Sequence, residues 1–345
     1  MCAALAWAVA VQGAGACSIP VFRYGLDRWP ADQYRLEVPA GVMATEPLAA
    51  VFRNLGNDAP VNLRVTPLAG QPAEAPARLL FPTSDAIAWT GRLDSASLSA
   101  LTDSPARAEI ARRILAGDSG VWVLVESDRR EADEAFAQAL EKRLRFLENV
   151  AELPHIDPND PSSRLGLGPE LRVKFSLLRV RADDPAETLL IRMLRGPKDK
   201  TFAPDAPWAG LVFGRGRVLG AWPAADLPDE TVDESSLFLL GACSCQVKDL
   251  NPGWDLLLAT NWEAGLEAAE KQRLSSTVSI ASTASTLSTA PPAPNAPSPQ
   301  PETVLINTAA HAPPAADFTR SLLLGSGAAL LAAAGLFLWR RSVRK

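Results

Sequence analysis

The alternation of apolar and polar positions in the second half of the chain predicts strands and helices in a definite order. The apolar run GVWVLVES, residues 120–127, has the length of a buried strand, and residues 128–150 carry apolar side chains at helical spacing. Residues 171–180 alternate as a second strand, and residues 208–222 predict two strands around the turn Gly214-Arg215-Gly216. Residues 233–243 then predict a closing helix.

Residues at the expected helix ends support this division. Asp128 and Glu131 have the spacing of a capping box at the start of the helix that follows the first strand. A second helix is predicted from Asp184 as N-cap and Pro185 at the first helical position, and it closes on Gly196. The full order from residue 120 to residue 245 is therefore β-α-β-α-β-β-α.

This order resembles the thioredoxin core, and the resemblance implies an α/β, thioredoxin-like domain over residues 118–274. In that family the redox Cys-x-x-Cys lies where the first strand enters the first helix, which corresponds here to ESDRREAD, residues 126–133. That segment contains no cysteine. Pro207, just before the third strand, matches the position of the family's cis-proline. The resemblance thus implies the fold without the family's usual redox chemistry.

Residues 17–117 predict a degenerate copy of the same plan, or another α/β domain, so that two thioredoxin-like units would lie in tandem. The segment CSIPVFRYGLDRW, from Cys17, suits a first helix, and a strand, a helix and three strands follow. Two closing helices are predicted next, the last one starting at Ser104-Pro105. In this alignment Cys17 falls at the redox position of the family, with CSIP in place of Cys-x-x-Cys.

The two ends of the chain predict export and a membrane anchor. Residues 1–16 are read as a signal peptide, since an apolar run ends in Ala14-Gly15-Ala16, and lipidation of Cys17 is the alternative. Residues 321–339 carry no charge, and at about 1.5 Å per residue they match a hydrocarbon core about 30 Å thick. Residues 340–345 are basic, which favours a cytoplasmic tail. The expected protein is single-pass, with its N-terminal part outside the cytoplasm.

Residues 275–320 join the predicted domains to the predicted anchor. Ser, Thr, Ala and Pro dominate this segment, and within residues 275–316 the one formally charged residue is Glu302. Such a composition cannot bury enough apolar surface to order itself, so an extended stalk is expected.

Composition excludes several classes of function. The formal net charge is -5, and no long basic run precedes the last residues, so no nucleic-acid partner is expected. With two histidines, His155 and His311, the chain cannot build a multi-histidine metal site, and a Ser-His-Asp arrangement would depend on His155. The sequence therefore offers no complete catalytic set, and we expect no cofactor.

Cys243 and Cys245, together with Cys17, are the candidate site residues. Removal of residues 1–16 would leave three cysteines in an oxidising compartment, so one thiol would stay unpaired or pair with another chain. If residues 243–245 are extended, both sulfur atoms lie on one face, and Lys248 would favour a thiolate. Three readings stay open: a structural disulfide of Cys17 with one of the pair, redox use or binding of a soft metal such as Cu(I), and buried free thiols.

Two further segments hint at ligand sites, and each has a simpler reading. Residues 214–220 suggest a dinucleotide loop, but no helix follows them, so a hairpin turn is favoured. The acidic residues of HIDPNDPSSRLGLG, residues 155–168, suggest loose Ca²⁺ binding, but the spacing is not that of an EF-hand. A surface loop punctuated by proline is favoured there.

The segments CSIPVFRYGLDRW and CSCQVKDLNPGWDLLLA resemble a family of uncharacterised bacterial proteins with a signal peptide and a C-terminal anchor. That resemblance implies the layout and no activity. The sequence thus predicts a non-catalytic binding or scaffolding ectodomain with the membrane and an envelope protein as partners. The alternatives are a tethered thiol-disulfide or copper-handling protein and an accessory subunit of an envelope transporter.

Overall fold

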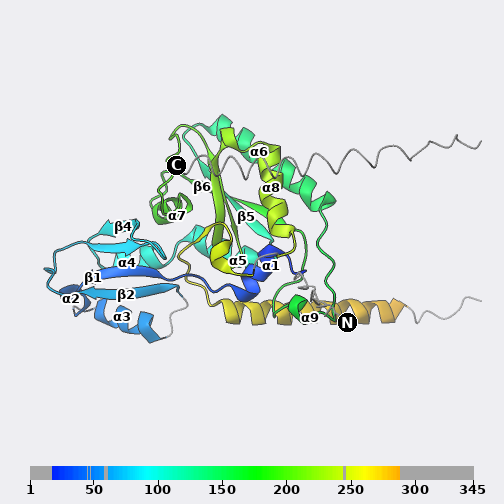
Figure 1. The fold of residues 1–345 in the computed structure, drawn as a ribbon, viewed down its shortest axis with the longest axis horizontal. Coiled ribbons are helices and arrows are strands. Elements are labelled where there is room, and N and C mark those ends of the chain that lie inside the picture. The colour runs from blue at the N-terminus through cyan, green and yellow to red at the C-terminus, as the bar shows by residue number, and fades with distance from the viewer. Residues whose placement is uncertain (1–17, 45, 47, 58–60, 244–245, 288–345) are drawn as a thin grey trace, which may run out of the picture. The chain divides into compact units, whose positions relative to one another are not determined.

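In this computed structural model, residues 18–44, 46, 48–57, 61–243 and 246–287 are described. They form a mixed α/β structure with two mixed sheets (Figure 1). The first sheet has the strand order β2-β1-β3-β4, with β1 and β2 parallel and the other neighbours antiparallel. Its strands are β1 (Tyr34–Pro39), β2 (Leu63–Leu68), β3 (Ala77–Leu80) and β4 (Ile87–Gly91).

Helices connect and follow the strands of this sheet. Two lie between β1 and β2, namely α2 (Ala40–Met43) and α3 (Leu48–Asn57), and two follow β4, namely α4 (Ser95–Thr102) and α5 (Pro105–Leu115). The last of these begins as expected, because Ser104 caps it and Pro105 occupies its first position.

The second sheet has the strand order β6-β5-β7-β8-β9. Strands β5 and β6 are parallel, and the pairs β5–β7, β7–β8 and β8–β9 are antiparallel. The predicted order of elements is present between β5 and α8. The elements are β5 (Gly120–Glu126), α6 (Arg130–Val150), β6 (Phe175–Arg181), α7 (Thr188–Leu194), β7 (Trp208–Phe213), β8 (Arg217–Pro223), α8 (Asp229–Leu240), β9 (Trp254–Asp255) and α9 (Trp262–Leu287), with short 3₁₀ turns at Pro161–Ser163, Ala224–Asp226 and Lys248–Leu250.

Strand β5 separates two apolar cores. Val121, Val123 and Val125 belong to a core that also contains residues of the first sheet, such as Leu36. Trp122 points to the opposite side, into a core formed with residues of α6 and α8. Since alternate side chains of a strand point to opposite faces, a strand covered on both faces needs a continuous apolar run. This accounts for the run at 120–125.

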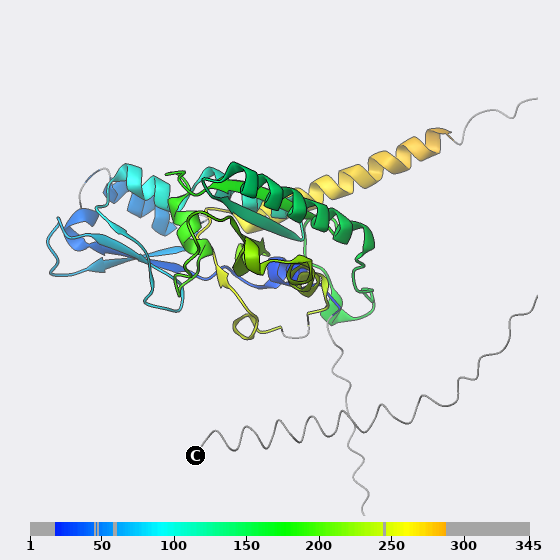
Figure 2. The same cartoon turned by 90° about the horizontal axis from the view of Figure 1, so that it is seen from above.

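Helix α1 (Val21–Arg28) corrects one part of the predicted plan. It was expected as the first helix of the N-terminal unit, but its apolar side chains lie in the core of the second sheet, and it lies next to α8 (Figure 2). Two glycines permit this approach. A Cβ on Gly214, whose φ is +56°, would lie 3.2 Å from the carbonyl carbon of Gly25. Packing against β7 and β8, rather than sequence position, decides where this helix belongs.

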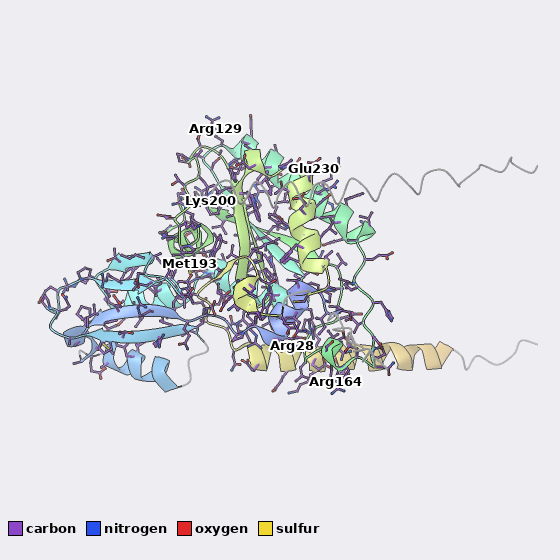
Figure 3. All side chains as sticks on the ribbon, viewed as in Figure 1. Arg28, Arg129, Arg164, Met193, Lys200 and Glu230 are labelled. Atoms are coloured by element: carbon purple, nitrogen blue, oxygen red, sulfur yellow. The ribbon has the colours of Figure 1, made fainter. Side chains whose placement is uncertain are left out.

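The connection between α6 and β6 is also held by α1. Arg23 Nη1 donates to the carbonyl oxygen of Pro169 over 2.7 Å. Arg28 Nη2 donates to that of Arg164 over 2.9 Å, and Figure 3 labels these last two residues. Arg23 also forms an ion pair with Asp27, 2.9 Å long, and both side chains are 3% exposed. The arginines of α1 therefore hold the backbone of this connection by hydrogen bonds to its carbonyl oxygens.

Two predicted helix starts differ from the observed ones. Helix α6 has Arg129 as N-cap without a side-chain hydrogen bond, and the carboxylate of Asp133 instead accepts hydrogen bonds from Ser127. Helix α7 begins at Thr188. Glu187 is buried and accepts hydrogen bonds from Ser104 Oγ (2.6 Å) and Ala106 N (2.8 Å), at the start of α5. At α6 a different local contact replaces the predicted capping box, and at α7 Glu187 caps the distant helix α5 instead of its own.

The predicted fold class and localisation need correction. Among the described residues, no helix is both long enough and apolar enough to cross a membrane. The expected thioredoxin-like fold with a membrane helix is therefore replaced by a mixed α/β structure with two mixed sheets, and a single-pass location is not supported. The segments read as signal peptide, anchor and basic tail (1–16, 321–339 and 340–345) lie outside the described residues.

Helix α9 extends to Leu287, into the segment expected to be a stalk. Where the expected stalk begins, Ser275 Oγ and Ser276 Oγ donate to the carbonyl oxygen of Gln272. Such bonds to the preceding turn allow serine residues to be part of a helix. Residues 288–320 of the predicted stalk lie outside the described residues.

Candidate functional site

The two segments that carry the cysteine motifs lie side by side, although more than two hundred residues separate them. Pro20 and Ala242 form an antiparallel bridge. Cys243 N donates to the carbonyl oxygen of Ile19 over 2.9 Å, and Trp29 Nε1 donates to that of Gln246 over 3.0 Å. The chain is extended at Gly241, so the closing helix expected over residues 233–243 ends earlier, at Leu240. The segments from Ile19 and from Gly241 are thus parts of one local structure.

Cys243 is 1% exposed and belongs to the apolar core beneath α1, α6 and α8. A buried cysteine in such surroundings packs as a small apolar side chain. Cys17 and Cys245 lie outside the described residues, so the three readings of the cysteine set remain predictions.

Lys248 takes part in an ionic cluster close to the two segments. Its Nζ lies 2.9 Å from Asp32 Oδ1, contacts the carboxylate of Asp255 and donates to the carbonyl oxygen of Pro30 over 2.6 Å. The expected role of Lys248, favouring a cysteine thiolate, finds no support among these contacts. The ammonium group is occupied by two carboxylates and a carbonyl.

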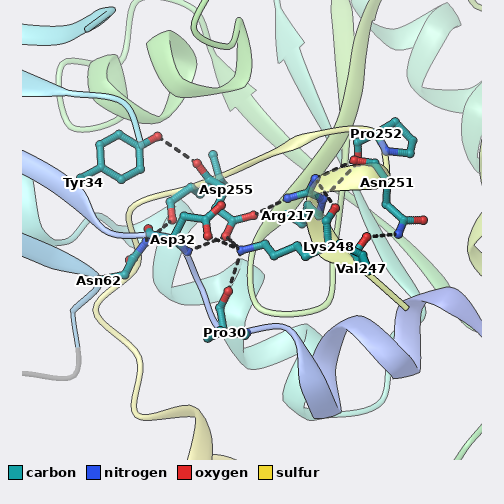
Figure 4. A network of polar contacts seen from close by, with 11 residues as sticks. Pro30, Asp32, Tyr34, Asn62, Arg217, Val247, Lys248, Asn251, Pro252 and Asp255 are labelled. Atoms are coloured by element: carbon teal, nitrogen blue, oxygen red, sulfur yellow. Dashed lines mark hydrogen bonds and ion pairs between the residues drawn. The ribbon is translucent and has the colours of Figure 1, made fainter. Parts of the chain in front are cut away.

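Asp255 lies at the centre of what we call the Asp255 cluster, which consists of Asp32, Arg217, Lys248 and Asp255 (Figure 4). Arg217 Nη1 lies 3.2 Å from Asp255 Oδ1, and the backbone N of Asp32 donates to Asp255 Oδ2 over 2.7 Å. Tyr34 Oη donates to the backbone carbonyl of Asp255 over 2.9 Å. The cluster therefore connects the start of β1 with β8, β9 and the 248 turn.

Burial sets the electrostatics of this cluster. The side chain of Asp255 is 2% exposed, and loss of hydration raises its pKa above 3.8, although the charge of Lys248 opposes the shift. Burial also raises the pKa of Tyr34 well above 10.0, with the charge of Asp255 adding to the effect. Ionic groups removed from water in this way are stable only when every charge keeps its partner.

Little space adjoins the Asp255 cluster. The cavity bordered by Gly25, Trp29, Arg217 and Asp255 has a volume of about 10 Å³. That is room for one water molecule at most. The cluster is thus a connection within the fold rather than a place for a ligand.

The glycine-rich hairpin supplies one residue of this cluster. Strands β7 and β8 meet at Gly214-Arg215-Gly216, so the predicted turn is confirmed. Arg217 is buried, and Arg215 donates from Nε to the carbonyl oxygen of Leu26 and lies 2.7 Å from Glu263. Arg215 therefore connects the hairpin to α1 and α9, and Arg217 connects it to residues 248–255.

In the acidic loop considered for Ca²⁺ binding, residues 155–168, the carboxylate of Asp160 bonds to neighbouring residues of the same loop. Asp160 accepts hydrogen bonds from the hydroxyl groups of Ser162 and Ser163, and these bonds lower its pKa. No group of three or more His, Cys, Asp or Glu residues in the described part of the chain is arranged to hold a metal ion.

A larger opening, which we call the Arg195 pocket, lies between the two sheets. Its volume is about 650 Å³, in the usual range for small-molecule sites. One wall comes from β4 and α4, and the other from the connection after β6 and from α7 with its C-cap. The lining residues are Ala88, Trp89, Ser97, Ala100, Leu101, Ala182, Pro185, Ala186, Thr188, Leu189, Ile191, Arg192 and Arg195.

Hydrogen bonds from Trp254 and Leu257 hold helix α7, which forms one wall of the pocket. Met193 is fully buried, and its Sδ accepts a hydrogen bond from Leu257 N over 3.3 Å. Trp254 Nε1 donates to the carbonyl oxygen of Met193 over 2.7 Å. Arg192 Nη2 donates to the carbonyl oxygen of Ile87, which connects α7 directly to β4. Arg192, itself a lining residue, therefore connects the two walls, and Leu257 and Trp254 hold α7 from the side away from the pocket.

Polar groups of the lining differ in how they are used. Ser97 contributes to the capping box of α4, and Thr188 Oγ1 donates to the carbonyl oxygen of Pro185. Arg192 donates to two carbonyls and lies 3.5 Å from Asp199. The side chain of Arg195 has no hydrogen bond or ion pair with any described residue, and its Nε is shielded from water. Leaving such a donor unsatisfied costs about 1–3 kcal/mol.

The sequence contained no signal for this pocket. Residues 184–196 were correctly expected to include a helix, but nothing in the pattern indicates that Arg195 lacks a partner or that β4 faces α7. Comparison with protein families, curated proteins and solved structures finds no match for this chain. The resemblance drawn from the cysteine motifs therefore stays a prediction.

Proposed function

We propose that this chain is a non-catalytic binding module and that the Arg195 pocket is its binding site. The observation that carries the proposal is an opening of about 650 Å³ between the two sheets, with apolar walls and an arginine that has no partner in the described structure. Binding sites of this size combine mostly apolar walls with a few polar groups that orient the ligand.

The comparison with the Asp255 cluster supports this choice. There, every charged side chain already contacts an opposite charge, and the adjoining cavity has a volume of about 10 Å³. A ligand would have to break existing ion pairs to bind at that place. At the Arg195 pocket a ligand would instead satisfy a donor that has no acceptor.

The alternatives from the sequence gain no specific support. A thiol-disulfide or copper-handling role needs at least two accessible sulfur atoms, and the one described thiol, Cys243, is 1% exposed. A role beside an envelope transporter, with an envelope protein as partner, rests on no described contact. The pocket therefore takes precedence as the place to test.

A fragment screen by ligand-observed NMR with the full chain tests this proposal. Ala186 lines the pocket and is exposed, so Ala186→Trp should fill the opening without disturbing a core. Ala135→Trp, at an exposed position of α6 away from the pocket, is the matched control. We expect fragments that bind the parent protein and the control variant and are lost in Ala186→Trp. Binding that survives Ala186→Trp, or no binding at all, would refute the proposal.

A further inference from the structure

We propose that the ligand of the Arg195 pocket is a small amphiphilic monoanion, that is, an apolar body with one carboxylate, and that Arg195 binds the carboxylate. This inference rests on the binding function proposed above and names the chemical class of the ligand. Charge, the state of Arg195 and the character of the walls support it separately.

The charge of the pocket is positive. Its described lining contains two arginines, Arg192 and Arg195, and no acidic side chain. The charge of Arg192 is partly balanced by Asp199, 3.5 Å away, and its donors serve the carbonyl oxygens of Gly196 and Ile87. The guanidinium group of Arg195 therefore has no counter-charge among the described residues, and a ligand with one negative charge would balance it better than a ligand with two.

Arg195 is positioned to receive that charge. Its Nε is shielded from water and has no acceptor, whereas its two terminal nitrogens are not among the shielded atoms and make no hydrogen bond with described residues. The guanidinium group is planar and presents paired N–H donors that match the two oxygens of a carboxylate. A carboxylate in the pocket would thus replace water at the terminal nitrogens with charge-assisted hydrogen bonds.

The remaining lining suits an apolar body. Leu101 and Leu189 are 3% and 7% exposed, and Trp89 and Ile191 complete an apolar surface on both walls. The hydroxyl groups of Ser97 and Thr188 already make hydrogen bonds within the fold. A ligand with polar groups along its length would lose water without finding partners, so the walls select against it.

Octanoate and octanamide have the same apolar chain and differ in the charge of the head group, so comparing their affinities tests the role of the negative charge. Isothermal titration calorimetry with the full chain should give octanoate at least about tenfold tighter binding than octanamide, since a charge-assisted pair is replaced by a neutral one. In Arg195→Gln the preference should fall to about twofold or less. Arg195→Lys keeps the charge and should retain part of it. Arg64→Gln, at an exposed position of β2 outside the pocket, removes the same charge and should change nothing.

The outcomes distinguish this inference from the function beneath it. Equal affinity for the two probes, or a preference that survives Arg195→Gln, overturns the assignment of a monoanion while the binding module stands. Failure of both probes, while screened fragments still bind and are lost in Ala186→Trp, has the same meaning. Octanoate binding that Ala186→Trp leaves unchanged overturns both the ligand class and the site.

Discussion

The Asp255 cluster and the Arg195 pocket both place charged side chains where water is partly excluded, but they differ in pairing. In the cluster, Asp255 contacts Lys248 and Arg217, and the adjoining cavity has a volume of about 10 Å³. At the pocket, Arg195 has no partner in the described structure and borders a volume of about 650 Å³. The paired charges of the cluster stabilise the fold, whereas the unpaired donors of Arg195 can form hydrogen bonds with a ligand.

Removal of the central carboxylate should have the largest effect. Asp255→Ala leaves Arg217 and Lys248 without their shared counter-charge, so we expect the free energy of unfolding to fall by about 3–5 kcal/mol. Urea denaturation measures this change. The control is Asp85→Ala, because the side chain of Asp85 is 92% exposed and pairs with Arg35 at the surface; there a loss below about 1 kcal/mol is expected. Similar losses in the two variants would contradict the distinction.

A backbone change beside the cluster should have the next largest effect. Gly253 has φ +111°, and a Cβ at this position would lie 2.3 Å from the carbonyl oxygen of Val218. Gly253→Ala should therefore cost at least about 2 kcal/mol in thermal or chemical denaturation. Gly70 also has a positive φ, +73°, but a Cβ there would meet nothing within 4 Å. Gly70→Ala should cost less, about 1 kcal/mol, and an equal cost would show that the close approach is unimportant.

A smaller effect is expected from pH. Burial raises the pKa of Asp255 above 3.8, so the folded state holds this proton at a higher pH than the unfolded state does. Relative to Asp255→Asn, the parent protein should gain stability as pH falls through the folded-state pKa and reach a plateau below about 3.8. Denaturation of both proteins across this range, with ¹³C NMR titration of the carboxyl group, measures the effect. Titration of Asp255 below 3.8 would reverse the sign.

The smallest effect on stability is expected at the pocket. Arg195→Gln breaks no hydrogen bond or ion pair with described residues, so the free energy of unfolding should change by about 0.5 kcal/mol or less. Arg217→Gln makes the same chemical change within the Asp255 cluster and should be far more costly, because Arg217 is buried beside Asp255. Denaturation of the two variants side by side is the measurement. A large loss in Arg195→Gln would mean that this arginine supports the fold.

Much of the secondary structure could be predicted because its signals are local. The apolar run at 120–125 indicates a strand buried on both faces, and Ser104-Pro105 marks the start of α5 as observed. The hairpin at Gly214-Arg215-Gly216 follows from turn residues between two apolar segments. Capping was predicted less well, since Glu187 caps a helix that lies far from it in the sequence.

The candidate site could not be predicted in the same way. The two cysteine segments were expected to meet only if Cys17 formed a disulfide with Cys243 or Cys245, whereas backbone hydrogen bonds join Ile19 and Cys243 directly. Lys248 suggested an activated thiol, and its contacts are with Asp32 and Asp255 instead. Which charges are paired depends on distances between segments, and a single sequence does not contain those distances.

By itself, the sequence determined the order of strands and helices from β5 to α8, because periodicity and turn chemistry act over a few neighbouring residues. Helix α9 was not predicted, and its last residues lie in the segment expected to be a stalk. Only the tertiary structure decided that α1 packs on the second sheet, that Arg217 and Asp255 are buried together, and that Arg195 remains unpaired beside an opening. The physical reason is that burial and ion pairing depend on which distant segments meet. Packing buries Asp255 among its partners, whereas Arg195 borders the pocket without a partner in the described structure.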